Sequence, residues 1–367
     1  MIIKLDNYIG QTKIVSFAKT DTTIQNLFKE NLETVYVKDG KLKFLLSGEE
    51  RTLSDKNIIL FNQCHDYDVF EIDEVGNAFL YYSNERVDNA LMLSSKCNSN
   101  CIMCPVSDGI RKKNNTPANI ILDIIKHMPK YPSHITITGG EPFIIGTDIF
   151  TIFKALKNKF RSTEFLLLTN GRALAYKPYF EKFRETIPNN TIIGIPIHGH
   201  NEELHDNITR STGGFKQTII GIKHLLAYDY KVELRMVVSN FNKEHIGDIA
   251  ELIVTEFHNV YSVKIMGLEM LGNAAKNQND VWVSYNEAFA YSKNAIVKLI
   301  ENGIDVALYN FPLCSVEENF HLICKKSITD YKINFFDECN QCSLKNSCGG
   351  VFDGSKRLAK YDIKPWR

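Results

Sequence analysis

The pattern of apolar and polar positions changes twice along the 367-residue chain. Up to about residue 86, short runs that alternate apolar and polar residues are separated by turn-forming residues, which is typical of short β-strands. From Asn89, apolar runs alternate with longer stretches of helical periodicity, and this predicts βα units and a parallel sheet. We therefore expect a small strand-rich N-terminal domain (residues 1–86), an α/β domain (87–303) and a cysteine-rich extension (304–367).

The α/β region contains six apolar runs that we predict to be strands, and this number predicts a partial (β/α)6 barrel of the TIM type. In such a barrel the loops that follow the strands meet at one mouth, where active sites are built. The predicted strands cover residues 90–95, 134–140, 164–171, 191–199, 231–239 and 262–269. The predicted helices include residues 119–128, 148–158, 245–257 and 286–303.

Charge and composition indicate no large charged partner. The 43 basic and 43 acidic residues cancel, so no summed field would attract nucleic acid or an anionic membrane. No stretch resembles a secretion signal or a run of about eighteen apolar residues, and we expect a soluble cytoplasmic protein with no membrane or nucleic-acid partner. Nine cysteines in a reducing compartment favour metal ligation over disulfides.

The first group of candidate ligands is Cys97, Cys101 and Cys104, which directly follow the first predicted barrel strand. Three thiolates spaced as CxxxCxxC can ligate three irons of one iron–sulfur cubane and leave the fourth iron open. A zinc knuckle is the alternative, although tetrahedral structural zinc would require a fourth ligand from elsewhere. The expected position of this loop is the mouth of the barrel.

Two further strand ends carry unusual residues. The second predicted strand ends in Gly139, Gly140, Glu141 and Pro142, and the third ends in a segment that contains Asn170. Glycine lacks a Cβ, so it lets a ligand approach the main chain closely, while proline fixes the exit of the chain. An ordinary strand-to-helix turn would look similar when taken alone.

Later strand ends supply weaker candidates. Ser239 and Asn240 follow the fifth predicted strand, and Met266 follows in the sixth. Each can equally serve in a loop or in packing. His198 and His205 could transfer protons, but a single histidine is more often an ordinary hydrogen-bonded residue.

The extension carries a second group of candidate ligands, Cys314, Cys339, Cys342 and Cys348. Four thiolates could enclose a second [4Fe-4S] cluster, and a four-cysteine zinc site that staples the segment is the alternative. Cys324 is a possible substitute ligand.

The CxxxCxxC spacing, the GGEP strand end and the LTNG strand end together resemble the radical SAM superfamily. This resemblance implies a [4Fe-4S] cluster on Cys97, Cys101 and Cys104 whose open iron is chelated by S-adenosylmethionine (SAM). It also implies that the GGEP segment binds the SAM amino group. Residues of the fourth to sixth strands, here Ser239, Asn240 and Met266, would contact the rest of SAM. The extension resembles a truncated auxiliary-cluster (twitch or SPASM) segment.

The order of motifs from residue 85 to residue 354 resembles, more narrowly, the radical SAM maturases of His-Xaa-Ser repeat peptide systems. The motifs include LMLSSKCNSNCIMCPVS, MGLEMLGNA, YNFPLC and CNQCSLKNSCGG. This resemblance implies a ribosomally made precursor peptide as substrate, a second radical SAM maturase and a small accessory protein as partners, and an external one-electron reductant. The alternatives are a radical SAM enzyme acting on a small molecule or RNA, and a non-catalytic iron–sulfur or zinc scaffold.

Overall fold

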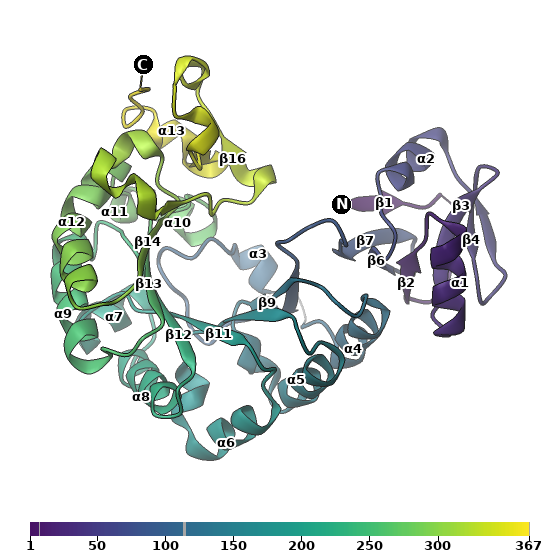
Figure 1. The fold of residues 1–367 in the computed structure, drawn as a ribbon, viewed down its shortest axis with the longest axis horizontal. Helices are drawn as coiled ribbons and strands as arrows, with labels where there is room; N and C mark the ends of the chain where they lie inside the picture. The colour runs from purple at the N-terminus through teal and green to yellow at the C-terminus, as the bar shows by residue number, and fades with distance from the viewer. Residues whose placement is uncertain (7, 113–114, 367) are drawn as a thin grey trace.

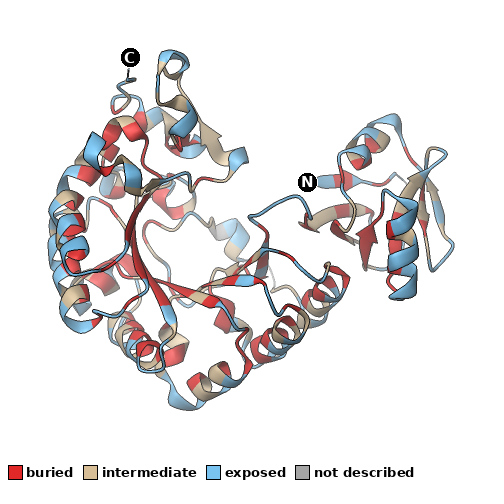
Figure 2. Ribbon diagram, in the orientation of Figure 1, coloured by how far each residue is buried: buried red, intermediate tan, exposed pale blue. Residues whose placement is uncertain are grey.

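The computed structural model describes residues 1–6, 8–112 and 115–366 (Figure 1). A strand-rich N-terminal domain lies beside one end of a curved, half-open array of strands and helices. The C-terminal segment lies at the other end of this array. Within the array, buried residues lie along the strands and on the inward faces of the helices (Figure 2).

The N-terminal domain is built on a seven-stranded sheet with the strand order β1-β7-β6-β2-β3-β4-β5. Its core contains three packed rings, Phe17, Phe61 and Phe70. Thr20 and Ser54 cap the two helices, because each side chain accepts a hydrogen bond from the first helical turn. The elements are β1 (Ile2–Lys4), β2 (Lys13–Phe17), α1 (Asp21–Lys29), β3 (Thr34–Lys38), β4 (Lys41–Phe44), β5 (Glu50–Thr52), α2 (Asp55–Asn62), β6 (Val69–Ile72) and β7 (Asn77–Tyr82).

The central array is an eight-stranded parallel sheet in which each strand pairs with the next along the chain, from β8 to β15. This arrangement confirms the predicted α/β fold class and partial barrel. The strands are β8 (Ala90–Ser94), β9 (His134–Gly139), β10 (Glu164–Leu168), β11 (Thr191–Pro196), β12 (Lys231–Val237), β13 (Ser262–Met266), β14 (Val306–Tyr309) and β15 (Cys324–Lys325).

The sheet has two strands more than the six that the sequence predicts, and both lie beyond residue 304. β14 is only four residues long and β15 only two, so neither carries a pattern that marks a strand by itself. They are strands because β14 pairs with β13 and β15 pairs with β14. The domain boundary near residue 304 stays a prediction.

The longer helices cover the outer, convex face of this sheet (Figure 1). On α4, for example, Ile121, Ile124 and Ile125 are buried, at the spacing that places them on one face. The helices are α3 (Asp108–Arg111), α4 (Ala118–His127), α5 (Asp148–Lys159), α6 (Lys177–Thr186), α7 (Glu202–Thr209), α8 (Gly214–Leu226), α9 (Ile246–Glu256), α10 (Gly272–Lys276), α11 (Gln278–Val281) and α12 (Tyr285–Glu301).

The C-terminal segment contains a two-stranded sheet, one helix and several turns of 3-10 helix. Its elements are β16 (Ile333–Asn334), β17 (Val351–Phe352) and α13 (Lys356–Ala359). The 3-10 helices of the chain are η1 (Pro142–Ile145), η2 (Arg172–Ala175), η3 (Lys243–His245), η4 (Leu313–Ser315), η5 (Glu318–Ile323), η6 (Asp330–Lys332), η7 (Asp337–Gln341), η8 (Lys345–Ser347) and η9 (Asp353–Ser355).

Buried contacts join the three parts. Ile14, Val69 and Tyr82 of the N-terminal domain belong to the main hydrophobic core of the α/β array. In the C-terminal segment the fully buried Ser355 hydroxyl accepts a hydrogen bond from the Met270 N–H at 3.1 Å. Within the described residues, no helix has the length and apolar character needed to cross a membrane.

Candidate active site

A pocket lies where the parallel strands of the array end. Its wall combines the ends of several strands, as expected for a barrel mouth. The structure brings seven of the residues predicted from the sequence to this pocket, namely Cys97, Cys101, Cys104, Gly139, Gly140, Asn170 and Met266.

The three cysteines belong to one loop, residues 97–104, which we call the cysteine loop. Main-chain N–H groups point at two of its sulfurs: the Ser99 N–H donates to Cys97 Sγ and the Val106 N–H to Cys104 Sγ, each at 3.4 Å. Such donors favour the thiolate form that a metal requires. Burial raises the pKa of the Cys101 thiol to about 12. The donor set therefore fits a cluster bound by three thiolates, whose assembly releases protons.

Residues far away in the sequence hold the cysteine loop in place. The Asn100 N–H donates to the carbonyl oxygen of Thr209, and the Ile102 N–H donates to that of Ile208, at the end of α7. On the other side the Asn273 side chain donates to the carbonyl oxygen of Cys101 at 3.0 Å. The loop is thus clamped between α7 and α10.

Two more side chains extend this clamp. Asn277 Nδ2 donates to the carbonyl oxygen of Ile102 at 3.0 Å. Arg172 Nη1 donates to the carbonyl oxygen of Asn98 at 2.8 Å and to Ser99 Oγ at 3.1 Å. Neither Asn277 nor Arg172 was predicted as a site residue. Arg172 directly follows the LTNG strand end, and this position is the signal that could have identified it.

The glycines of the second strand end allow the main chain of β9 to lie against the main chain that leads into the cysteine loop. A Cβ on Gly139 would lie 2.4 Å from the Ser94 carbonyl oxygen, and one on Gly140 would lie 2.4 Å from that of Lys96. The Gly140 N–H donates to the Ser94 oxygen at 2.7 Å. Any larger residue would push the two segments apart.

Glu141 and Pro142 do not line the pocket. The Glu141 carboxylate is 2% exposed and accepts hydrogen bonds from Thr169 Oγ1 at 2.8 Å and from the Asn170 N–H at 2.7 Å. A third bond comes from the N–H of Phe143 at 3.1 Å. Burial raises the pKa of Glu141, and these hydrogen bonds act in the opposite direction. Glu141 therefore fixes the third strand end, which carries Asn170 into the pocket.

Ser239 and Asn240 also lie outside the pocket lining. Ser239 is fully buried, and both its N–H and its hydroxyl donate to Asn242 Oδ1, at 2.8 and 3.1 Å. The Asn240 N–H donates to the carbonyl oxygen of Val281. Their predicted contacts with SAM stay a prediction.

The charged side chains that line the pocket are cationic. They are Arg111, Arg172 and Arg235, and among the described lining residues there is no aspartate or glutamate. His198 and His205 line the same pocket, and burial lowers the pKa of His198 to about 3 and that of His205 to about 4. Both imidazoles are therefore neutral near pH 7, and Arg235 is paired with Glu233 at 2.7 Å.

The four predicted ligands of the extension also meet in one place. Cys314, Cys339, Cys342 and Cys348 line one small cavity with largely apolar walls. The Leu313 and Gly350 N–H groups each donate to Cys348 Sγ at 3.4 Å. Four thiols around one cavity are a donor set for an iron–sulfur cluster, and a four-cysteine zinc ion stays the alternative. Cys324 lies in β15, and it does not line the cavity.

Two curated proteins match part of the chain. AdoMet-dependent heme synthase of Methanosarcina barkeri is 29% identical over 165 residues, which are 44% of this chain and 45% of the relative. Molybdenum cofactor biosynthesis protein moc-5 of Caenorhabditis elegans is 25% identical over 231 residues, which are 62% of this chain and 36% of the relative. The match thus spans less than half the length of either relative.

Among solved structures, Streptococcus suis SuiB bound to its precursor peptide SuiA resembles the chain. The likeness covers 62% of this chain and 49% of that chain, with a TM-score of 0.50 and 13% sequence identity. An identity this low concerns the fold alone.

The fold and the pocket define a partial-barrel protein whose mouth carries a three-cysteine loop. Residues 91–253 match the family described as Radical SAM superfamily, so the chain contains a radical SAM domain. This family uses a [4Fe-4S] cluster and SAM. The narrower resemblance to the maturases of His-Xaa-Ser systems stays a prediction.

Proposed function

We propose that the protein is a radical SAM enzyme whose cluster is held by Cys97, Cys101 and Cys104. One observation carries the proposal: these cysteines share a pocket with Gly139, Gly140 and other strand-end residues of a parallel barrel. A [4Fe-4S] cluster bound there would supply the electron that cleaves SAM to methionine and a 5′-deoxyadenosyl radical, which takes a hydrogen atom from the substrate.

The chain's own residues position the reactants in this proposal. Asn273, Asn277 and Arg172 hold the cysteine loop through its main chain, so the sulfurs keep a fixed place. Glu141 fixes the strand end that presents Asn170. A carbon radical attacks most C–H bonds it meets, so the surrounding walls must hold one target bond close and exclude water.

We further propose that the substrate is a ribosomally made peptide of the His-Xaa-Ser repeat type. The motif order along residues 85–354 supports this substrate class, and so does the bound precursor peptide of SuiB, a protein of similar fold. The four-cysteine cavity supports an auxiliary [4Fe-4S] cluster on Cys314, Cys339, Cys342 and Cys348. A second radical SAM maturase, a small accessory protein and an external one-electron reductant complete the proposed system.

Anaerobic reconstitution followed by iron counting and a SAM-cleavage assay tests the catalytic proposal. We expect about eight irons per chain, and 5′-deoxyadenosine after addition of dithionite and SAM. Replacing Cys97, Cys101 and Cys104 together by Ala should remove about four irons and all cleavage. Replacing Cys339 and Cys342 should remove the other irons and leave cleavage in place. Cys64→Ala changes a buried thiol outside both cavities and is the matched control.

Stoichiometric zinc without SAM cleavage would refute the catalytic proposal. About four irons and full cleavage, together with zinc that is lost when Cys339 and Cys342 are replaced, would identify the extension as a zinc staple.

A deuterated peptide tests the substrate proposal separately. If a His-Xaa-Ser repeat peptide is the substrate, its deuterium should appear in the 5′-deoxyadenosine. Cleavage of SAM without deuterium transfer would instead favour a small molecule or RNA as substrate.

A further inference from the structure

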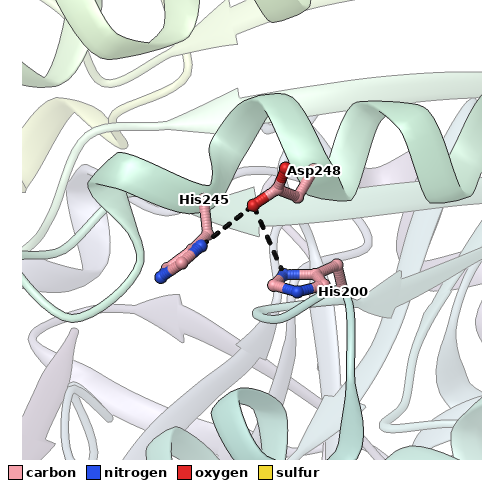
Figure 3. A group of neighbouring side chains, drawn as sticks. All are labelled: His200, His245 and Asp248. Carbon is pink, nitrogen blue, oxygen red and sulfur yellow. Dashed lines mark hydrogen bonds and ion pairs between the residues drawn. The ribbon is translucent and has the colours of Figure 1, made fainter.

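Three side chains, one from a loop and two from the start of a helix, point toward one another (Figure 3). His200 follows β11, while His245 ends η3 and Asp248 lies in the first turn of α9. One possible ligand atom from each residue lies within 4.8 Å of the other two. Among the described residues this is the one group of three or more His, Cys, Asp or Glu side chains that meets this distance.

The carboxylate lies between the two imidazoles. Asp248 Oδ2 is 2.9 Å from His245 Nδ1 and 3.8 Å from His200 Nδ1. The two rings are 5.2 Å apart and tilted by 39°, so they converge on the carboxylate without stacking face to face. The Asp248 side chain is 57% exposed, which leaves room for water beside it.

Contacts within the protein do not use all the hydrogen-bonding capacity of these three side chains. Among the described residues, the ion pairs of Asp248 involve the two imidazoles alone. His200 Nδ1 is buried and has no hydrogen-bond partner. The buried His200 Nδ1 and a carboxylate thus face the same small volume from different parts of the chain.

We propose that His200, His245 and Asp248 form a site for a divalent transition-metal ion such as Zn²⁺. Two imidazole nitrogens and one carboxylate oxygen suit such ions, whereas Mg²⁺ and Ca²⁺ prefer oxygen ligands alone. Bonds of about 2.0–2.1 Å in tetrahedral geometry place ligand atoms about 3.3 Å apart. The observed separations of 2.9 and 3.8 Å lie on either side of this value. Water would complete the coordination.

Asn201 limits the affinity of this site. Its Nδ2 lies 2.9 Å from His200 Nε2, and its Oδ1 caps α7 by accepting from the Leu204 N–H. An ion on Nδ1 leaves the ring proton on Nε2, which then faces a second donor. Asp at position 201 would retain the cap and accept this proton. Asn201→Asp should therefore tighten metal binding.

The site links two loops of the barrel mouth. His200 lies two residues after His198, and the side chain of Asn242, close to His245, donates to the His198 carbonyl oxygen at 3.1 Å. A bound ion would reinforce this connection. The cysteines take no part in it, so the site does not depend on SAM cleavage.

Equilibrium dialysis against Zn²⁺, with bound zinc measured by mass spectrometry, tests the site on protein whose cysteines are loaded with iron and sulfide. The wild type should bind one zinc per chain. His200→Ala and Asp248→Asn should each weaken binding by roughly tenfold or more, and Asn201→Asp should tighten it by roughly tenfold. His258→Ala, which removes an exposed histidine outside the group, is the control and should bind like the wild type.

Absence of bound zinc in the wild type would overturn the proposal. Equal binding by the wild type and the His200→Ala protein would overturn it as well. Iron content and the thermal unfolding midpoint of each variant establish that the protein is folded.

Discussion

Glu141 is the residue on which the third strand end depends, because its buried carboxylate accepts three hydrogen bonds. In Glu141→Gln an amide NH₂ replaces one of the two oxygens. If it faces the Asn170 N–H, two donors oppose each other in a buried place. We expect a loss of about 1–3 kcal/mol in the free energy of unfolding and weaker SAM binding. Denaturant titration and SAM-binding calorimetry measure the two effects.

Glu164→Gln is the matched control, because this glutamate is exposed on β10. A Glu141→Gln protein as stable as this control would show that the carboxylate does not fix the strand end.

The buried histidines make stability depend on pH. The pKa values of His198 and His205, about 3 and about 4, lie below the ordinary 6.5. The stability that these two histidines contribute is therefore fully present above pH 6.5. It is lost as the pH falls, because their imidazoles bind protons in the unfolded chain at a higher pH than in the folded protein. Between pH 7 and pH 5, each of the two histidines should lower the free energy of unfolding by about 2 kcal/mol.

Unfolding of His198→Gln and His205→Gln at both pH values measures this effect. Each substitution should reduce the loss of stability between pH 7 and pH 5, whatever its effect on stability at pH 7. An unchanged pH dependence in both variants would argue that these imidazoles titrate in the folded protein as they do in the unfolded chain.

At the level of elements, the close packing of β9 against the entry to the cysteine loop requires glycine. A Cβ at position 140 would lie 2.4 Å from a main-chain oxygen, which cannot move as a side chain can. Gly140→Ala should therefore lower the free energy of unfolding by about 1–3 kcal/mol and reduce the iron content of the reconstituted protein. Gly247→Ala, in α9, is the control: a Cβ there meets no atom within 4 Å, so we expect unchanged iron content and equal or higher stability.

The sequence predicts the elements whose pattern is local. The six apolar runs became β8 to β13, and the helix at residues 119–128 became α4 because Ile121, Ile124 and Ile125 mark one face. The two-residue β15 has no such pattern and exists only through its pairing with β14. Contacts between distant residues of the site also escape prediction from local patterns. Asn273 binds the main chain of Cys101 across 172 positions, and no local pattern reveals this contact.

At the scale of the whole molecule, the C-terminal segment is attached to the barrel by buried polar contacts. Ser355 Oγ accepts from the Met270 N–H and donates to the Leu268 carbonyl oxygen at 3.1 Å. Ser355→Ala leaves the Met270 N–H without its partner. This should lower the free energy of unfolding by about 1–3 kcal/mol. Hydrogen exchange should become faster in residues 330–366 and stay unchanged in β9 to β12.

Ser347→Ala, at an exposed position of the same segment, is the control and should exchange like the wild type. Faster exchange throughout the chain would mean that Ser355 supports the entire fold and not the attachment alone.

The clamp on the cysteine loop also sets an order of events during synthesis. The loop begins at residue 97, but Asn277, which binds the carbonyl oxygen of Ile102, lies 175 positions after that residue. While the ribosome is still making the intervening chain, the three thiols are present but their native support is not. Iron delivered before residue 277 has emerged would meet an unformed loop. Loading of a cofactor into the native loop therefore waits until residue 277 has emerged, and the nascent thiols must stay reduced until then.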